Sequence, residues 1–399
     1  MSDSPRDKGR QGPSTRAVRG GEHTPEQGNT VGTPIHQTST FFFQDSAEVR
    51  DYAEGKKPRD EYGRYSNPTW RAVEGKLCEL EGAEAAVLFA SGMCAATTTF
   101  LALLPKGGHL VVTSDCYRRT RQFARQYLSK LGVEVTVIEP ADTIALKDAL
   151  RDDTTLFFTE SPTNPYLRVV DLPEAVRIAH ERGVKVIVDA TFASPANHAP
   201  LGDGADLVIH SATKYLGGHN DLLAGVVAGK AADVAPIREA VGVLGGILDA
   251  HAAWLLLRGM KTLCLRVERQ NATGLQLARW LEDQPQVRRV WYPGLESHPD
   301  YAVATRLMKG FGGVVTFELE TDLEGAMRFT DACRIPYIAP SLGGVDSLVE
   351  MPVLMSYWDQ PAEERRKYGI TDTLVRYSCG IEDAEDLQAD LAQALRAIG

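Results

Sequence analysis

The sequence predicts an α/β fold in which a large domain, built on a mainly parallel sheet of seven strands, is followed by a smaller α+β domain. Two observations lead to this prediction. Between residues 85 and 227, short apolar runs rich in β-branched residues alternate with stretches of helical period, which is typical of βαβ units. From about Arg258 the alternation stops, and a long helical stretch leads to isolated strands and a closing amphipathic helix.

The seven apolar runs are expected to form the strands of the larger sheet. They are Ala85–Ala90, His109–Thr113, Val133–Ile138, Thr155–Glu160, Val184–Asp189, Asp206–His210 and Leu223–Val227. Helices are expected between them at Met93–Leu104, Arg118–Leu131 and Leu172–Arg182. Parallel strands connected by helices in this way form a sheet that is covered on both faces.

The C-terminal part is expected to contain one long helix, Ala250–Glu282, then the strands Gly313–Leu319 and Thr373–Ser378, and finally the helix Asp383–Ala397. The chain therefore divides into three parts. An N-terminal arm spans residues 1–66, and its beginning, to about Asn29, has the composition of a disordered segment. The large domain spans residues 67–258 and the smaller domain residues 259–399.

Composition argues against several classes of function. The 399 residues carry a net charge of −10, whereas a nucleic-acid binder needs a basic face. No apolar run is long enough to span a bilayer, and the first residues lack the apolar segment of a secretory signal. Six cysteines without a C-x-x-C pair and nine histidines without metal-ligand spacing argue against a disulfide scaffold and a metal site. We therefore expect a cytoplasmic protein that holds no metal.

Polar residues follow several of the predicted strands, at the edge where sheets of this kind bind their ligands. Ser91–Met93 comes after the first run and opens a helix, so it is either an ordinary cap or an anion site. Asp189 ends another run and is either a turn former or a carboxylate that faces a cation. In the next segment, the hydroxyls of Ser211 and Thr213 share one side while Lys214 points to the other.

One ligand uses all of these groups. Pyridoxal 5′-phosphate (PLP) needs a lysine for its aldehyde, an acidic partner for its pyridinium nitrogen and a site for its phosphate. Tyr117 follows the second predicted strand and is placed to stack on the ring. The strand ends therefore indicate a PLP site.

Several motifs in the same order resemble the trans-sulfuration family of PLP enzymes. They are YGRYSNPT (62–69), ASGM (90–93), ESPTNP (160–165), SATKY (211–215), GHNDLLAG (218–225) and SLGG (341–344). Within that family, the segments DCYRRTRQF, IPYIAPSLGG, MSYWD and KYGITDTLVR are similar to the branch of plant-type cystathionine γ-synthases. The resemblance extends from about Pro34 to the C-terminus and implies the type I fold of PLP-dependent transferases.

The resemblance also implies roles for individual residues. Lys214 would bind PLP covalently and act as the catalytic base, with Asp189 on the ring nitrogen. The remaining cofactor contacts would be Gly92, Met93, Ser211 and Thr213 on the phosphate, Tyr117 on the ring and Asn164 on its 3-oxygen. Tyr62 and Arg64 would reach the phosphate from the neighbouring subunit, so active sites would be shared in a dimer, usually within a homotetramer. Ser341 and Arg376 would bind the substrate carboxylate.

Two departures from the pattern of relatives bear on the substrate. Pro340 precedes Ser341 where cystathionine lyases often have Glu, which argues against a lyase. Arg118 and Arg119 follow the stacking tyrosine where many relatives have Gly-Gly. Cations at a helix N-terminus oppose the helix dipole, so these arginines are either a pocket for an anionic leaving group or a surface ion-pair network.

The implied activity is γ-replacement in methionine biosynthesis: an O-succinyl- or O-phospho-L-homoserine would react with L-cysteine to give L-cystathionine. The alternatives are γ-elimination to α-ketobutyrate, as in cystathionine or methionine γ-lyases, and a sulfhydrylase that uses sulfide. A regulator that binds PLP without turnover is a third alternative, but the intact set of Lys214, Tyr62, Tyr117 and Arg376 argues against it.

Overall fold

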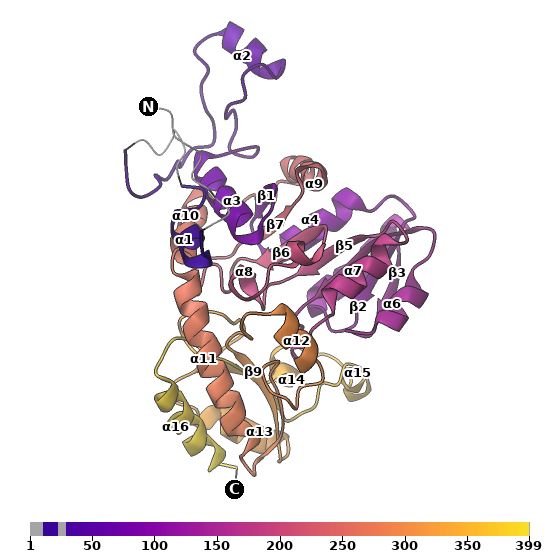
Figure 1. Ribbon diagram of the computed structural model, residues 1–399, viewed down its shortest axis with the longest axis vertical. Helices are drawn as coiled ribbons and strands as arrows, with labels where there is room; N and C mark the ends of the chain where they lie inside the picture. Colours follow the sequence, from indigo (N-terminus) through magenta and orange to yellow (C-terminus); the bar gives the residue numbers. More distant parts are fainter. Residues whose placement is uncertain (1–10, 23–28, 399) are drawn as a thin grey trace.

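The structure is a computed structural model that describes residues 11–22 and 29–398, and its core is built on two sheets (Figure 1). The larger sheet has seven strands in the order β1-β7-β6-β5-β4-β2-β3. These strands are β1 (Ala85–Phe89), β2 (His109–Thr113), β3 (Glu134–Ile138), β4 (Thr154–Glu160), β5 (Lys185–Asp189), β6 (Leu207–Ser211) and β7 (Gly225–Gly229). Each lies within two residues of a run predicted from the sequence, which confirms the seven-stranded sheet.

Most of the larger sheet is parallel. The strands from β3 through β2, β4 and β5 to β6 pair in parallel, whereas β7 pairs antiparallel with both β6 and β1. The carboxyl ends of β2, β4, β5 and β6 therefore meet along one edge, where the residues following these strands can face a common ligand.

Helices cover both faces of this sheet, as expected. Alternate side chains of each strand point to opposite faces, so Val87 and Phe89 pack with α4 (Gly92–Leu103) and α9 (Ala231–Leu244), while Ala86 and Leu88 lie in the other core. On that second face lie α3 (Pro68–Glu81), α6 (Thr143–Ala149) and α7 (Leu172–His180). Short pieces complete this part of the chain: α8 (Ser194–Asn197) and η4 (Pro200–Asp203).

The smaller sheet has the strand order β10-β11-β12-β9-β8. Its strands are β8 (Val287–Trp291), β9 (Val314–Leu319), β10 (Tyr337–Ile338), β11 (Leu348–Glu350) and β12 (Leu374–Ser378). Around it lie α12 (Tyr301–Leu307), α13 (Leu323–Ala332), α14 (Pro352–Met355), α15 (Ala362–Lys367) and α16 (Ala384–Leu395). The predicted strands at 313–319 and 373–378 are confirmed, whereas β8, β10 and β11 were not predicted. The domain boundaries near residues 66 and 258 stay a prediction.

Two helices predicted as continuous are interrupted. The stretch 250–282 consists of α10 (Ala250–Met260) and α11 (Leu263–Glu282), and α11 runs down along the smaller sheet (Figure 1). The break lies where the Thr262 hydroxyl donates a hydrogen bond to the Gly259 carbonyl, which competes with the regular helical pattern. The stretch 118–131 likewise consists of α5 (Arg118–Gln126) and the 3₁₀ turn η3 (Leu128–Leu131).

The expectation of a disordered beginning is wrong for residues 13–22, while residues 1–10 and 23–28 lie outside the described part. Helix α1 (Pro13–Arg19) packs against α3, where the buried Lys76 Nζ donates a hydrogen bond to the Ala17 carbonyl at 2.6 Å and pairs with Glu22 at 3.2 Å. By contrast, α2 (Ser46–Ala53) buries no residue and stands away from both sheets (Figure 1). Among the described residues, no helix is both long enough and apolar enough to cross a membrane.

Candidate active site

A cavity of about 260 Å³ lies at the carboxyl ends of β4, β5 and β6 and is closed on its other side by residues of the smaller sheet. It gathers ten of the residues predicted for the site: Gly92, Met93, Tyr117, Asn164, Asp189, Ser211, Thr213, Lys214, Ser341 and Arg376. Four predicted residues, Tyr62, Arg64, Arg118 and Arg119, do not line it within this chain.

One wall of the cavity is a close approach between backbone segments. A Cβ atom on Gly92 would lie 2.7 Å from the Ser211 Cβ, so only glycine fits at the start of α4. The Ser91 side chain caps this helix by accepting a hydrogen bond from the Cys94 N–H at 3.1 Å. The preceding first-turn N–H groups, at Gly92 and Met93, have no acceptor within the helix and are free to bind an anion.

Asp189 ends β5 with its carboxylate held in place by the next turn. Its Oδ1 accepts hydrogen bonds from the Thr191 N–H at 3.0 Å and from the Thr191 hydroxyl at 2.5 Å. Burial raises the pKa of Asp189, so the ionised carboxylate would gain from a cation brought next to it. Thr191 was missed in the sequence, although its hydroxyl follows the predicted acid by two residues.

Lys214 extends into the same cavity. Its Nζ donates a hydrogen bond to the Ser341 hydroxyl at 2.6 Å. Burial, together with the charge of Arg376, lowers the pKa of Lys214 to about 8, and the nearby Glu350 only partly offsets this. The neutral, nucleophilic fraction of this amine near physiological pH is therefore much larger than that of an ordinary lysine, while the charged form still predominates.

Arg376 is almost fully buried on β12 and is bound on several sides. Its Nη1 donates to the Asn164 side-chain oxygen at 3.0 Å, and its Nη2 donates to the Ser341 carbonyl at 2.9 Å. The same Nη2 lies 3.0 Å from a carboxylate oxygen of Glu350, which ends β11 directly opposite Arg376. Glu350 was missed in the sequence; an acid ending the apolar run SLVE was the available signal.

A second acid that the sequence analysis missed, Glu160, positions the aromatic residue of the site. Glu160 ends β4 and accepts a hydrogen bond from the Tyr117 N–H at 2.8 Å. Burial and the neighbouring Asp189 raise the pKa of Glu160 well above its ordinary value. Tyr117 is 44% exposed and lines the cavity, so its ring is available for a flat ligand to stack on.

The two arginines after Tyr117 lie in different surroundings. Arg118 lines a small recess that shares Tyr117, Asn164 and Glu350 with the main cavity, and its guanidinium forms two bonds to Asp359, at 3.0 and 2.8 Å. Arg119 lies on the exposed side of α5, where it donates to the Gln122 side chain at 2.8 Å.

The two arm residues lie apart from this chain's cavity. Arg64 stacks on the rings of Tyr62 and Tyr65 and donates a hydrogen bond to the Gly242 carbonyl.

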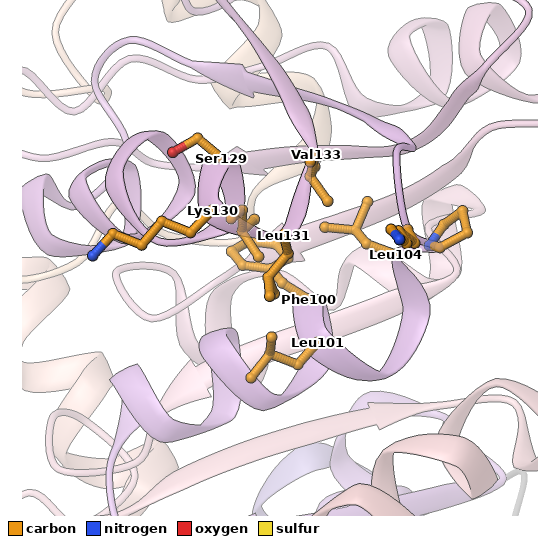
Figure 2. A pocket seen from close by; sticks show the side chains of 11 residues that line it. Phe100, Leu101, Leu104, Ser129, Lys130, Leu131 and Val133 are labelled. Atoms are coloured by element: carbon orange, nitrogen blue, oxygen red, sulfur yellow. The ribbon is translucent and has the colours of Figure 1, made fainter.

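A larger cavity, of about 670 Å³, lies at the opposite end of α4 and does not resemble an active site. Apolar side chains from α4 and η3, among them Phe100, Leu101 and Leu131, form much of its lining (Figure 2). It contains Lys106 and Lys130 but no acid, so it lacks a partner for a base or for a ring nitrogen.

The residues of the main cavity fit PLP. The glycine-lined helix start and the Ser211 and Thr213 hydroxyls suit its phosphate, the buried Asp189 suits its protonated ring nitrogen, and the Lys214 amine suits its aldehyde. A protonated ring nitrogen would also supply the cation that the buried carboxylate of Asp189 favours.

Comparison with known proteins agrees with this fit. Residues 14–396 match the family described as Cys/Met metabolism PLP-dependent enzyme. The chain is 54% identical over 371 residues to cystathionine gamma-synthase 1, chloroplastic, of Arabidopsis thaliana, covering 93% of this chain and about two thirds (66%) of that protein. It is 39% identical to the O-succinylhomoserine sulfhydrylase of Pseudomonas aeruginosa, covering 96% of this chain and 95% of that one. The solved structure of metB from Corynebacterium glutamicum superposes with a TM-score of 0.93 at 35% identity, covering 99% and 100% of the two chains.

The lowered pKa of Lys214 predicts an unusual reactivity of the protein freed of its cofactor. Acetylation of Lys214 by acetic anhydride should reach half its maximal rate near pH 8, because a buried amine loses its proton more readily. In the same protein unfolded in urea, the midpoint should move to about 10.4, the value of an ordinary lysine. Peptide mass spectrometry after labelling across a pH series measures both midpoints, and equal midpoints would contradict the electrostatic description of the site.

Proposed function

Because the chain belongs to the family of PLP-dependent enzymes of cysteine and methionine metabolism, we propose that it replaces the γ-substituent of an activated L-homoserine ester with L-cysteine, giving L-cystathionine. Its substrates are amino acids, as the family implies. The observation that carries the proposal is the convergence of Lys214, Asp189 and Arg376 on one cavity, in a chain that resembles a named cystathionine γ-synthase along most of its length.

The arrangement of the side chains suits this reaction. Bound in the cavity, PLP supplies a ring that accepts electrons from the substrate's α-carbon. Arg376 and Ser341 orient the substrate carboxylate, so that the α- and β-carbons lie over the Lys214 amine. With a pKa of about 8, Lys214 can remove the proton from Cα and, once it has released that proton, the proton from Cβ. The γ-substituent then leaves, the cysteine thiol adds at Cγ, and protons return to Cβ and Cα.

Assay of the three homoserine esters, O-succinyl, O-phospho and O-acetyl, with and without cysteine tests the proposal. We expect cystathionine formation with cysteine to exceed α-ketobutyrate formation without it for the preferred ester. Borohydride reduction of the yellow protein should place the cofactor on Lys214, as peptide mass spectrometry would show. A dominant α-ketobutyrate product would support a γ-lyase instead, and a preference for sulfide over cysteine would support a sulfhydrylase.

We assign Arg118 and Arg119 to the leaving group of the ester. The contacts favour Arg118, because it lines a recess that shares Tyr117, Asn164 and Glu350 with the cavity, whereas Arg119 lies on the exposed side of α5. Asp359, which occupies the Arg118 guanidinium, is 67% exposed in its side chain. Because the Asp359 side chain is mostly in solvent, an anionic leaving group can compete with it for the Arg118 guanidinium.

Replacing Arg118 by Ala should lower kcat/KM for the preferred anionic ester about ten- to hundredfold, because one charge-assisted hydrogen bond contributes about 1.5–3 kcal/mol. The neutral O-acetyl ester should be almost unaffected. Arg119→Ala serves as the matched comparison and should lose less. Steady-state kinetics with both esters measures this, and equal losses on charged and neutral esters would mean that the arginines support the fold.

We further propose that the protein works as a dimer with shared active sites, within a homotetramer. The support is the place of Tyr62 and Arg64, which belong to an arm that leaves the body of the chain and whose helix α2 buries no residue (Figure 1). We also propose a cytoplasmic location, because the six cysteines of the protein are free thiols, as is typical of proteins in a reducing compartment.

Mixing of two inactive variants tests the shared site. Arg64→Ala and Lys214→Ala each disable every site of a homodimer, but a hybrid dimer contains one site in which both residues are native. Random exchange of subunits should therefore restore up to about a quarter of the native activity. Exchange is followed by native mass spectrometry of differently tagged chains, and exchange without recovery of activity would show that each site is built from one chain.

A further inference from the structure

Both two-donor edges of the Arg376 guanidinium include Nη2, and this nitrogen is already in contact with two oxygen atoms of the protein. Carboxylates bind arginine best through two parallel hydrogen bonds, either from Nη1 with Nη2 or from Nε with Nη2. Both arrangements require Nη2, which donates a hydrogen bond to the Ser341 carbonyl at 2.9 Å and lies 3.0 Å from a carboxylate oxygen of Glu350, with which it forms an ion pair. Nε is buried and has no hydrogen-bond partner among the described residues.

Glu350 is the contact that can yield. The Ser341 carbonyl belongs to the backbone, whereas Glu350 reaches Arg376 through a flexible side chain from the opposite strand. Glu350 is 4% exposed and Arg376 5% exposed, and Glu350 lines both the main cavity and the recess beside it. A carboxylate that binds Arg376 through two bonds, one of them from Nη2, therefore competes with Glu350 for the guanidinium.

From this geometry we infer that Glu350 is the resident counter-ion of Arg376, and that a substrate carboxylate displaces it with uptake of a proton. This inference rests on the proposed function, in which Arg376 binds the substrate carboxylate. A displaced Glu350 would be a buried acid beside a second carboxylate, without its cation. Both conditions favour the neutral form, so the displaced side chain becomes protonated.

The charged groups around Glu350 affect how the binding of a carboxylate to Arg376 depends on pH. Burial raises the pKa of Glu350, and the charges of Arg376 on β12 and Lys214 after β6 only partly offset this. Glu160 on β4 and Arg118 on α5 line the same cavity and its recess. All four groups remain in a Glu350→Gln variant, so a difference between variant and native protein isolates the titration of Glu350.

The consequence is that Glu350 positions Arg376 while the site is empty and weakens carboxylate binding as the pH rises. Uptake of one proton makes the association constant fall by up to tenfold for each pH unit, because the ionised Glu350 competes for the guanidinium. Glu350→Gln keeps an oxygen that can accept from Nη2 but removes the competing charge.

Calorimetric titration of the holoenzyme with butyrate tests the inference. Butyrate carries a carboxylate but no amine, so it can occupy Arg376 without reacting with the cofactor. Titrations at several pH values, each in two buffers of different ionisation enthalpy, give the association constant and the number of protons taken up. For the native protein we expect uptake approaching one proton and an association constant that falls between pH 6 and 9.

Two variants, one at Glu350 and one at an exposed control acid, separate the titration of Glu350 from that of other groups. Glu350→Gln should bind butyrate at least about tenfold more tightly at the upper end of this range, with uptake near zero and a flat pH profile. Glu324→Gln, which changes an exposed acid on α13, should behave as the native protein.

Butyrate that binds to the native protein without proton uptake would overturn the inference and leave the carboxylate role of Arg376 intact. A Glu350→Gln variant that binds more weakly than native, again without native proton uptake, would show a purely structural role. Absence of butyrate binding in the native protein and in both variants would overturn both the inference and the assignment of Arg376. The native titration alone decides the inference if Glu350→Gln fails to fold.

Discussion

The buried guanidinium of Arg376 joins the two sheets of this protein at the place where the cavity forms. Through Nη1 it binds Asn164, which follows β4 of the larger sheet, and through Nη2 it binds Ser341 and Glu350 of the smaller one. Two hydrogen bonds and one ion pair to a single buried cation hold the two halves together at this point. The position of Lys214 depends on the same cluster, because its amine binds the Ser341 hydroxyl.

The electrostatics of the cavity follow from burial more than from any single ion pair. Burial raises the pKa of the acids Glu160, Asp189 and Glu350 and lowers the pKa of Lys214. Each of these groups is therefore closer to its neutral form than it would be in water, and each gains from a ligand that supplies the opposite charge. The protonated ring nitrogen of the cofactor would supply such a charge to Asp189.

Close backbone packing makes the cavity possible. A Cβ atom on Gly225, at the start of β7, would lie 2.1 Å from the Ser91 carbonyl, and one on Gly92 would collide with Ser211. Gly343 has a positive φ of 74°, and a Cβ atom on it would lie 2.8 Å from the backbone nitrogen of Tyr215, the residue after Lys214. These contacts bring the helix start, the hydroxyls and the lysine within the reach of one small ligand. Side chains at the same positions would hold them apart.

The sequence by itself determined the elements and the chemistry that each segment brings. Apolar runs bounded by polar residues located all seven strands of the larger sheet, and the order of strands and helices indicated that Asp189, Ser211 and Lys214 would share one edge. These features are local, because strand periodicity and the residue after a strand are properties of adjacent positions. They can therefore be predicted from each segment without knowledge of the rest of the chain.

Only the tertiary structure decided which groups act on one another. The pairing of Glu350 with Arg376 depends on the register of β11 against β12, and β11 has only three residues, too few for a periodic signal. Two further contacts likewise join residues far apart in the chain: Glu160 binds Tyr117, and α1 packs on Lys76. The different surroundings of Arg118 and Arg119 depend on which way each side chain turns from α5. Such contacts arise from packing and burial, which are properties of the folded chain and not of any one segment.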